Sequence, residues 1–168
     1  GLHYTDFRIC YSYGCRQTAA VSLTDSDWEH VQAFFVPLPD TAEQERQLIS
    51  RVIRHFEQVT GEKTGIDTDI GGTFAGMFAS GQMDCEDEAV NTNIFLLLLQ
   101  DAHLIQFHRF FGIARRGAMV NGWPHMACAI EEIDTGERFV VDSWFSDHGM
   151  AVHVVAEALW KSGWTPEK

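Results

Sequence analysis

A single cysteine lies between acidic residues in the segment 81–89, Gly-Gln-Met-Asp-Cys-Glu-Asp-Glu-Ala. Cys85 is followed by an apolar run over 91–102, which is hydrophobic on all sides and therefore predicts a buried helix. A thiol at the start of a helix lies close to free backbone N–H groups and to the positive end of the helix dipole, which stabilise the nucleophilic thiolate. The neighbouring acids oppose this effect, so the segment predicts a reactive cysteine that needs a compensating positive group.

A second segment carries the residue types that a cysteine nucleophile needs as partners. His125 precedes an apolar run, 126–133, and Asp142 lies within the next run, 138–145. The Asp-Thr-Gly-Glu sequence between them predicts a β-hairpin with a short glycine-containing loop. Symmetric pairing across this loop places Asp142 opposite Ala129, about four residues from the position opposite His125, and a bulge or an off-centre turn would bring the two closer.

These residues suit nucleophilic catalysis by a thiol. A histidine takes the proton from the cysteine and returns it to the leaving group, and a carboxylate holds the imidazole in the required tautomer. Cys85, His125 and Asp142 are therefore the candidate nucleophile, general base and orienting group. The backbone N–H of Cys85 and the side chain of Gln82 are candidate donors to the oxyanion that forms on the attacked carbonyl.

The order and spacing of these residues resemble the transglutaminase-like cysteine peptidase superfamily. An Asp-Cys-Glu-Asp sequence occupies 84–87, His125 follows Cys85 by 40 positions, and Asp142 follows His125 by 17. The pattern is most similar to that of the bacterial transglutaminase-like cysteine proteinases. The resemblance covers mainly residues 81–145. It implies an α+β fold with a papain-like core, in which a buried helix with an N-terminal cysteine packs on an antiparallel sheet that carries the histidine and the aspartate.

The resemblance also implies an activity and a location. These proteinases cleave peptide bonds in the periplasm, so we expect a peptide or protein substrate and an exported, periplasmic or envelope-associated bacterial protein. In that family the acids that flank the nucleophile take part in calcium binding, which makes Asp84 and Glu86 candidate calcium ligands. No cofactor is required for the chemistry itself. The alternative for the two acids is the first turn of a helix, where the helix dipole favours negative charge.

The composition excludes several classes of partner. The chain of 168 residues has a formal net charge of -12 and a pI of about 4.9, whereas proteins that bind nucleic acid or anionic lipid need a positive field. No apolar run reaches the roughly 18 to 20 residues of a membrane span, and the first residues lack the basic and apolar regions of a signal peptide. We expect no nucleic-acid partner and no transmembrane segment, and we expect any export signal to have been removed.

Length and hydrophobic content predict one domain over 1–168, with an N-terminal arm and helices over 1–62 and a catalytic core over 81–145. The segment 62–80 is polar and glycine-rich and predicts a loop. An Asp-x-Asp sequence at 67–69 lacks the acceptor oxygens that an EF-hand needs at its later positions, so turn chemistry is favoured over calcium there.

The hydrophobic pattern predicts the elements that position the candidate site. Capping residues and helical periodicity indicate helices from Thr24 to about Phe35 and from Thr41 to Gly61. Runs of β-branched and aromatic residues indicate strands elsewhere. We expect a strand or extended arm over 6–23, one or two strands over 104–119 bent at Gly112, and a short helix over 154–160.

The remaining cysteines have structural interpretations. Cys10 and Cys15 are close enough in sequence for a local disulfide, which would indicate an oxidising compartment. The alternative is two unpaired cysteines in an N-terminal strand. Cys128 lies three positions from His125, so it faces the opposite side of the strand and is expected in the core.

Several other side chains fit plain surface or core positions. Trp123 and Trp144 either wall a substrate cleft or fill the edge of the core. Five basic side chains are expected at the surface: Arg46, Arg51 and Arg54 on the solvated side of the 41–61 helix, His103 at a helix end and His108 on a strand.

The leading hypothesis is a thiol hydrolase, a cysteine peptidase or amidase that uses a Cys-His-Asp triad and an acyl-enzyme intermediate. Transfer of the acyl group to an amine instead of water would make the protein an acyltransferase of transglutaminase type. A non-catalytic envelope binding module with the same fold is a further alternative, although such a module has no chemical reason to keep all three groups. The acidic segments leave a calcium-responsive structural protein as the last alternative.

Overall fold

The computed structural model describes residues 2–66, 84–117, 124–145 and 151–166, and its architecture is α+β. Its strands are β1 (Phe7–Tyr11), β2 (Gln17–Val21), β3 (His108–Arg116), β4 (His125–Glu132), β5 (Arg138–Asp142) and β6 (His153–Ala156). Its helices are α1 (Asp25–Ala33), α2 (Ala42–Thr64), α3 (Cys85–Asp101) and α4 (Glu157–Lys161).

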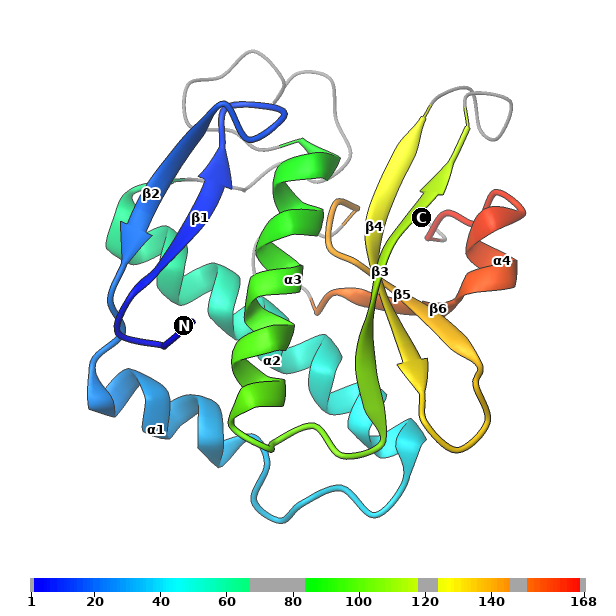
Figure 1. Ribbon diagram of the computed structural model, residues 1–168, viewed down its shortest axis with the longest axis horizontal. Coiled ribbons are helices and arrows are strands. Elements are labelled where there is room, and N and C mark those ends of the chain that lie inside the picture. Colours follow the sequence, from blue (N-terminus) through cyan, green and yellow to red (C-terminus); the bar gives the residue numbers. More distant parts are fainter. Residues whose placement is uncertain (1, 67–83, 118–123, 146–150, 167–168) are drawn as a thin grey trace.

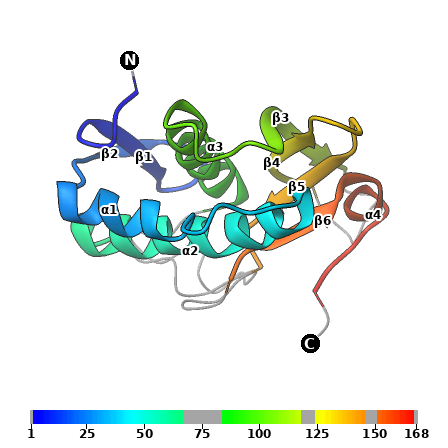
Figure 2. The same cartoon turned by 90° about the horizontal axis from the view of Figure 1, so that it is seen from below.

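Two antiparallel sheets flank one central helix. Strands β3, β4, β5 and β6 form a four-stranded sheet in that order, and β1 pairs with β2 in a separate hairpin. Figure 1 shows α3 between the hairpin and the four-stranded sheet, and Figure 2 shows α1 and α2 along one side of the molecule. None of the described helices is long and apolar enough to cross a membrane.

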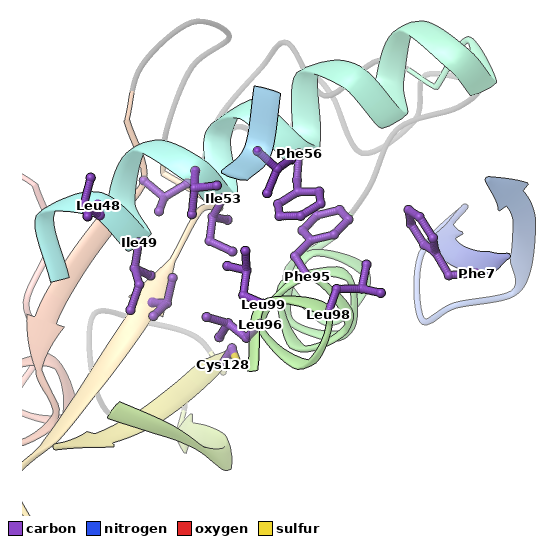
Figure 3. Close-up of a cluster of buried hydrophobic side chains, with 14 of the residues drawn as sticks. Phe7, Leu48, Ile49, Ile53, Phe56, Phe95, Leu96, Leu98, Leu99 and Cys128 are labelled. Carbon is purple, nitrogen blue, oxygen red and sulfur yellow. The ribbon is translucent and has the colours of Figure 1, made fainter. Parts of the chain in front are cut away.

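Helix α3 begins at Cys85, as the sequence predicts, because Asp84 caps it. The Asp84 side chain accepts from the Asp87 N–H and the Asp87 side chain accepts from the Asp84 N–H, which is a reciprocal capping box. No residue between 91 and 100 is exposed, which confirms the prediction of a buried helix. In the core, the ring of Phe95 stacks on Phe56 of α2 at 4.8 Å, and Figure 3 shows this pair between the two helices.

Helix α2 starts after the predicted cap, Thr41, but it ends later than expected. Its last residue is Thr64, and Gly65 terminates it with a left-handed φ of 71°. Gly61, the predicted end, lies inside the helix and its carbonyl accepts from the Gly65 N–H. The helix continues because Ile66 is buried beyond it, and an apolar stripe at helical spacing does not mark where tertiary packing stops.

Three of the basic residues expected at the surface are instead covered. Arg54 is buried and pairs with Glu57, because α2 packs on several elements and not on one face alone. Arg46 is partly buried, pairs with Glu132 at 2.8 Å and lies over the ring of Phe139. Arg51 and His103 are exposed, as predicted.

His108, the third covered residue, is fixed by a buried carboxylate of α2. Glu45 accepts from the backbone N–H groups of Gln106, Phe107 and His108 and contacts His108 Nδ1 at 2.9 Å. Arg46 Nη1 lies 3.2 Å from His108 Nε2, so Nε2 accepts and Nδ1–H donates to Glu45. The prediction of a surface histidine is wrong because the start of β3 turns inward onto α2.

The four-stranded sheet has two differently covered faces. Cys128, Ile130 and Val141 face the main core under α2 and α3, and Cys128 is fully buried, as predicted. Ala127 and Val140 face the opposite side, where Trp160 of α4 covers them. The predicted bend in the first strand is confirmed, because the β3–β4 register shifts between Phe110 and Gly112.

The β4–β5 hairpin has a register that differs from the symmetric one by two positions. Ala129 pairs with Val140 and not with Asp142, because Ile133 leaves the ladder and donates its N–H to the Phe107 carbonyl. The loop is therefore 133–136, closed by the bond from the Glu132 N–H to the Glu137 carbonyl.

The predicted helix over 154–160 is wrong in its first half. Residues His153–Ala156 form β6, paired with β5, and only Glu157–Lys161 is helical. Strand β5 offers an unpaired edge to this segment, and pairing there outweighs the local helical pattern. At the N-terminus, the predicted extended arm is the β1–β2 hairpin, and the helix predicted from Thr24 is α1.

The stacked pair in the core predicts a large loss of stability on truncation. We expect Phe95→Ala to lower the free energy of unfolding by about 3 to 5 kcal/mol, because it leaves a cavity between α2 and α3. The matched control is Phe111→Ala at an exposed position, which we expect to cost less than about 1 kcal/mol. Urea unfolding followed by circular dichroism measures both, and equal losses would contradict the packing described.

Candidate active site

Cys85 lies where three chain segments converge at one end of the molecule. Figure 1 shows that α3 and β4 begin at this end and that the β1–β2 turn lies there too. The thiol of Cys85 is free and partly buried, and the backbone N–H of Met126 hydrogen-bonds its sulfur. Because Met126 directly follows His125 in β4, the predicted nucleophile contacts the backbone of the residue next to the predicted base.

His125 and Asp142 are directly hydrogen-bonded. Nε2 of His125 lies 2.8 Å from Oδ2 of Asp142, and both side chains are about 1% exposed. The register of β4 and β5 explains this contact: continued by one pair, it places Asp142 opposite Ala127, two residues from His125 on the same face. Such diagonal neighbours are within reach of long side chains.

Three donors hold the carboxylate of Asp142. His125 and the indole N–H of Trp160 both approach Oδ2, the latter at 2.9 Å. The backbone N–H of Trp144 donates to Oδ1 at 3.1 Å, which closes an Asx turn at the end of β5. Sequence reasoning missed Trp160, and its place in a short C-terminal segment gives no signal of this role.

The two ring nitrogens of His125 have different surroundings, because only Nε2 is hydrogen-bonded to Asp142. Its ring is enclosed by the aromatic rings of Trp144, Phe145 and Trp160, with centroids 4.9, 5.2 and 5.5 Å away. Nδ1 is buried, and no described residue gives it a hydrogen-bond partner. Since Asp142 occupies Nε2, Nδ1 is the atom that can exchange a proton with a nearby group. Trp144 therefore packs on the base itself, whereas Trp123 lies outside the described residues.

The surroundings of Cys85 favour the protonated thiol. Burial raises the pKa of Cys85, and the negative charges of Asp84 and Asp142 raise it further. The backbone N–H groups of Met126 and of Cys85 itself act in the opposite direction, because they stabilise the thiolate. The thiol therefore needs a base to become nucleophilic near neutral pH.

The acids beside Cys85 are bound by the turn between β1 and β2. Cys10 and Cys15 form a disulfide, and the turn they close contains Ser12, Tyr13, Gly14 and Cys15, all with φ between 54° and 65°. The N–H groups of Tyr13 and Cys15 donate to the two oxygens of Asp87, and that of Gly14 donates to Asp84. Successive N–H groups in this conformation form a concave anion site.

The turn binds the acids that lie beside the thiol, but Asp84 still raises the pKa of Cys85. In the part of the chain that the structure describes, backbone dipoles and not a cation surround Asp84 and Asp87. A second contact fixes the hairpin on α3, because the side chain of Asn91 exchanges two hydrogen bonds with the backbone of Cys10. The disulfide settles the question that the sequence left open for the first two cysteines.

The described residues do not by themselves form a calcium site at the start of α3. Both oxygens of Asp84 accept backbone N–H groups, and Glu86 points outward as an exposed side chain. Calcium takes six to eight oxygen ligands. Among described residues, the group closest to a metal cluster is Cys10, Cys15 and Asp87, and its sulfurs are joined in the disulfide. Gln82 and the 67–69 sequence lie outside the described residues.

Comparisons of this chain with models of known protein families, with curated proteins and with solved structures found no match. The function is therefore inferred from the geometry of Cys85, His125 and Asp142.

The raised pKa of the thiol leads to a test. We expect Asp84→Asn to speed alkylation of Cys85 by iodoacetamide at neutral pH by roughly threefold. Removal of a nearby negative charge lowers the pKa of Cys85 and so increases the thiolate fraction, and asparagine still caps a helix. Alkylation followed by mass spectrometry over a range of pH measures the effect, and a rate equal to or below that of the wild type would contradict it.

Proposed function

We propose that this protein is a thiol hydrolase, a cysteine peptidase or amidase with a papain-like core of the transglutaminase-like type. The observation that carries the proposal is the state of His125. Nε2 is bonded to a buried carboxylate, and Nδ1 is buried with no partner among the described residues, beside the segment that contacts the thiol. A buried polar atom without a partner is costly, and catalytic sites are where such atoms are retained.

In this mechanism the Cys85 sulfur attacks the carbonyl carbon of an amide while its proton passes to Nδ1 of His125. Asp142 stabilises the resulting imidazolium and keeps its orientation. The tetrahedral intermediate then breaks the C–N bond, and the proton on Nδ1 goes to the leaving amine. Water attacks the thioester with His125 again as base, which releases the acid and restores the thiol.

The oxyanion of the intermediate needs donors near the sulfur. The backbone N–H of Cys85, at the first turn of α3, is the donor that the described residues favour, because it already acts on the thiolate. Gln82 remains a prediction. The aromatic rings of Trp144, Phe145 and Trp160 support the same chemistry, since they keep water away from the His125–Asp142 bond.

The substrate class follows from the proposed chemistry. A thiol nucleophile with a histidine base suits peptide and amide carbonyls, and hydrolysis is favoured over acyl transfer to an amine by the resemblance to proteinases. The Cys10–Cys15 disulfide supports an exported protein, since disulfides persist in oxidising compartments. The hydrogen-bonded His125–Asp142 pair argues against a binding module that has lost its chemistry.

The triad is tested by labelling with a thiol-directed electrophile. We expect an iodoacetamide probe near neutral pH to label Cys85 in the wild type and not in Cys85→Ala. We expect His125→Ala to slow labelling by at least about tenfold, because general-base assistance contributes two to four orders of magnitude.

Cys128 provides the internal control, since it is fully buried and burial raises the pKa of its thiol far above the usual range. It should remain unlabelled in every variant unless the protein unfolds. Equal labelling rates for the wild type and His125→Ala would remove His125 as the base.

A further inference from the structure

Strand β3 brings a buried arginine beside the candidate base. Arg116 is the last residue of β3, and it pairs with His125 in the register of β3 and β4. Directly opposite residues of neighbouring strands point to the same face of a sheet, so both side chains lie on the face that Trp160 covers. Figure 1 shows α4 beside the sheet, on the side away from α3. Arg116 is only 7% exposed, and it is not a member of the candidate triad.

The guanidinium of Arg116 binds the end of α4. Nη1 donates to the backbone carbonyl of Trp160 at 2.8 Å and to that of Trp164 at 2.7 Å. The guanidinium carbon also lies 4.8 Å from the centre of the Trp160 ring, within the range of a cation–π contact. A cation near the C-terminus of a helix stabilises its last carbonyl groups, which have no N–H partner within the helix.

Helix α4 has few local reasons to form. It is five residues long, whereas isolated helices shorter than about 12 to 15 residues are marginal in water. No side chain caps its N-terminus at Ala156. Tertiary contacts therefore set the position of α4, and the hydrogen bond from Arg116 to the Trp160 carbonyl is a directional one.

Trp160 connects this contact to the carboxylate of the candidate triad. Its ring is fully buried, and its indole N–H donates to Oδ2 of Asp142 at 2.9 Å. The same oxygen contacts Nε2 of His125. Because a hydrogen bond weakens steeply when its angle falls, a small rotation of the indole ring would release the carboxylate.

A buried guanidinium is a costly way to cover an indole ring. Transfer of a charge out of water is unfavourable, and Nε of Arg116 is buried with no partner among the described residues. Burial lowers the pKa of Arg116, and the nearby charge of Asp142 opposes this effect. An apolar side chain would fill the same place at a lower cost. The guanidinium therefore contributes orientation rather than stability.

We propose that Arg116 is a positioning residue for Asp142: it fixes the end of α4 so that the indole N–H of Trp160 holds the carboxylate oxygen that His125 contacts. This inference rests on the proposed function only where His125 is called the base, since each contact in the series is structural. Without Arg116, the Trp160 ring loses the contact that orients it, and the carboxylate keeps two of its three donors.

The test follows exchange of the Trp160 indole proton with deuterated water by NMR, and Trp160→Phe assigns the signal. Arg116→Met keeps apolar contact with the ring and removes both hydrogen bonds to carbonyl groups. We expect this variant to exchange the indole proton at least about tenfold faster than the wild type. The matched control is Arg115→Met at the preceding, exposed position, which should exchange as the wild type does.

Backbone amides at the buried centre of β4, those of Cys128 and Ala129, report general stability in the same spectra. In Arg116→Met we expect their exchange rates to change by less than about threefold. An unchanged indole rate would overturn the positioning role. Equal acceleration of the indole and of these amides would also overturn it, because Arg116 would then stabilise the whole fold and not orient one ring.

A second variant keeps the proposal testable if Arg116→Met does not fold. Trp160→Phe keeps an aromatic ring and removes the donor to Asp142, so we expect faster exchange of the N–H proton between His125 and Asp142. That signal is assigned by its absence in His125→Gln, and an unchanged rate in Trp160→Phe would overturn the inference. Neither measurement uses a substrate or a thiol label. A failure of the proposed hydrolase activity is therefore distinguishable from a failure of this inference.

Discussion

The carboxylates of Asp84 and Asp87 bind the first turn of α3 and the disulfide-closed turn of the β1–β2 hairpin at the same time, and the position of Cys85 depends on this contact. Acids next to a cysteine would ordinarily suppress its thiolate. Here their lone pairs are occupied by backbone N–H groups, so the acids serve as structural anchors. The thiol keeps a raised pKa, and the proposed chemistry consequently depends on a base.

That base depends on a different part of the fold. The two faces of the four-stranded sheet are covered by α2 and α3 on one side and by α4 on the other. His125 and Asp142 lie at the ends of neighbouring strands, and Trp160 of α4 completes the hydrogen bonds of the carboxylate. Cys85 lies on α3, which packs on this sheet, and its sulfur contacts the backbone N–H of Met126, the residue that follows His125 in β4. The candidate site is therefore a junction of layers, which a shift of either β4 or α3 would open.

The sequence predicts the local features well and the tertiary ones poorly. The predicted starts of three helices are confirmed, because capping is a property of a few adjacent residues. These helices are capped by Thr24, Thr41 and Asp84. Three predictions are wrong, because each feature is decided by a distant element: the hairpin register, a helix where His153–Ala156 form a strand, and an exposed Arg54, which is buried. The three candidate residues were found from their types and order. Trp160, which donates to Asp142, was not found, because no spacing relates it to the motif.

The most direct test of the account is detection of an acyl group on Cys85. The protein would be mixed with p-nitrophenyl acetate, quenched in acid at short times, and examined by peptide mass spectrometry. The account predicts an acetyl adduct on Cys85 that forms rapidly and then decays in the wild type, and that forms much more slowly in Asp142→Asn. Absence of any adduct on Cys85, or equal rates of formation in both proteins, would contradict the proposed triad.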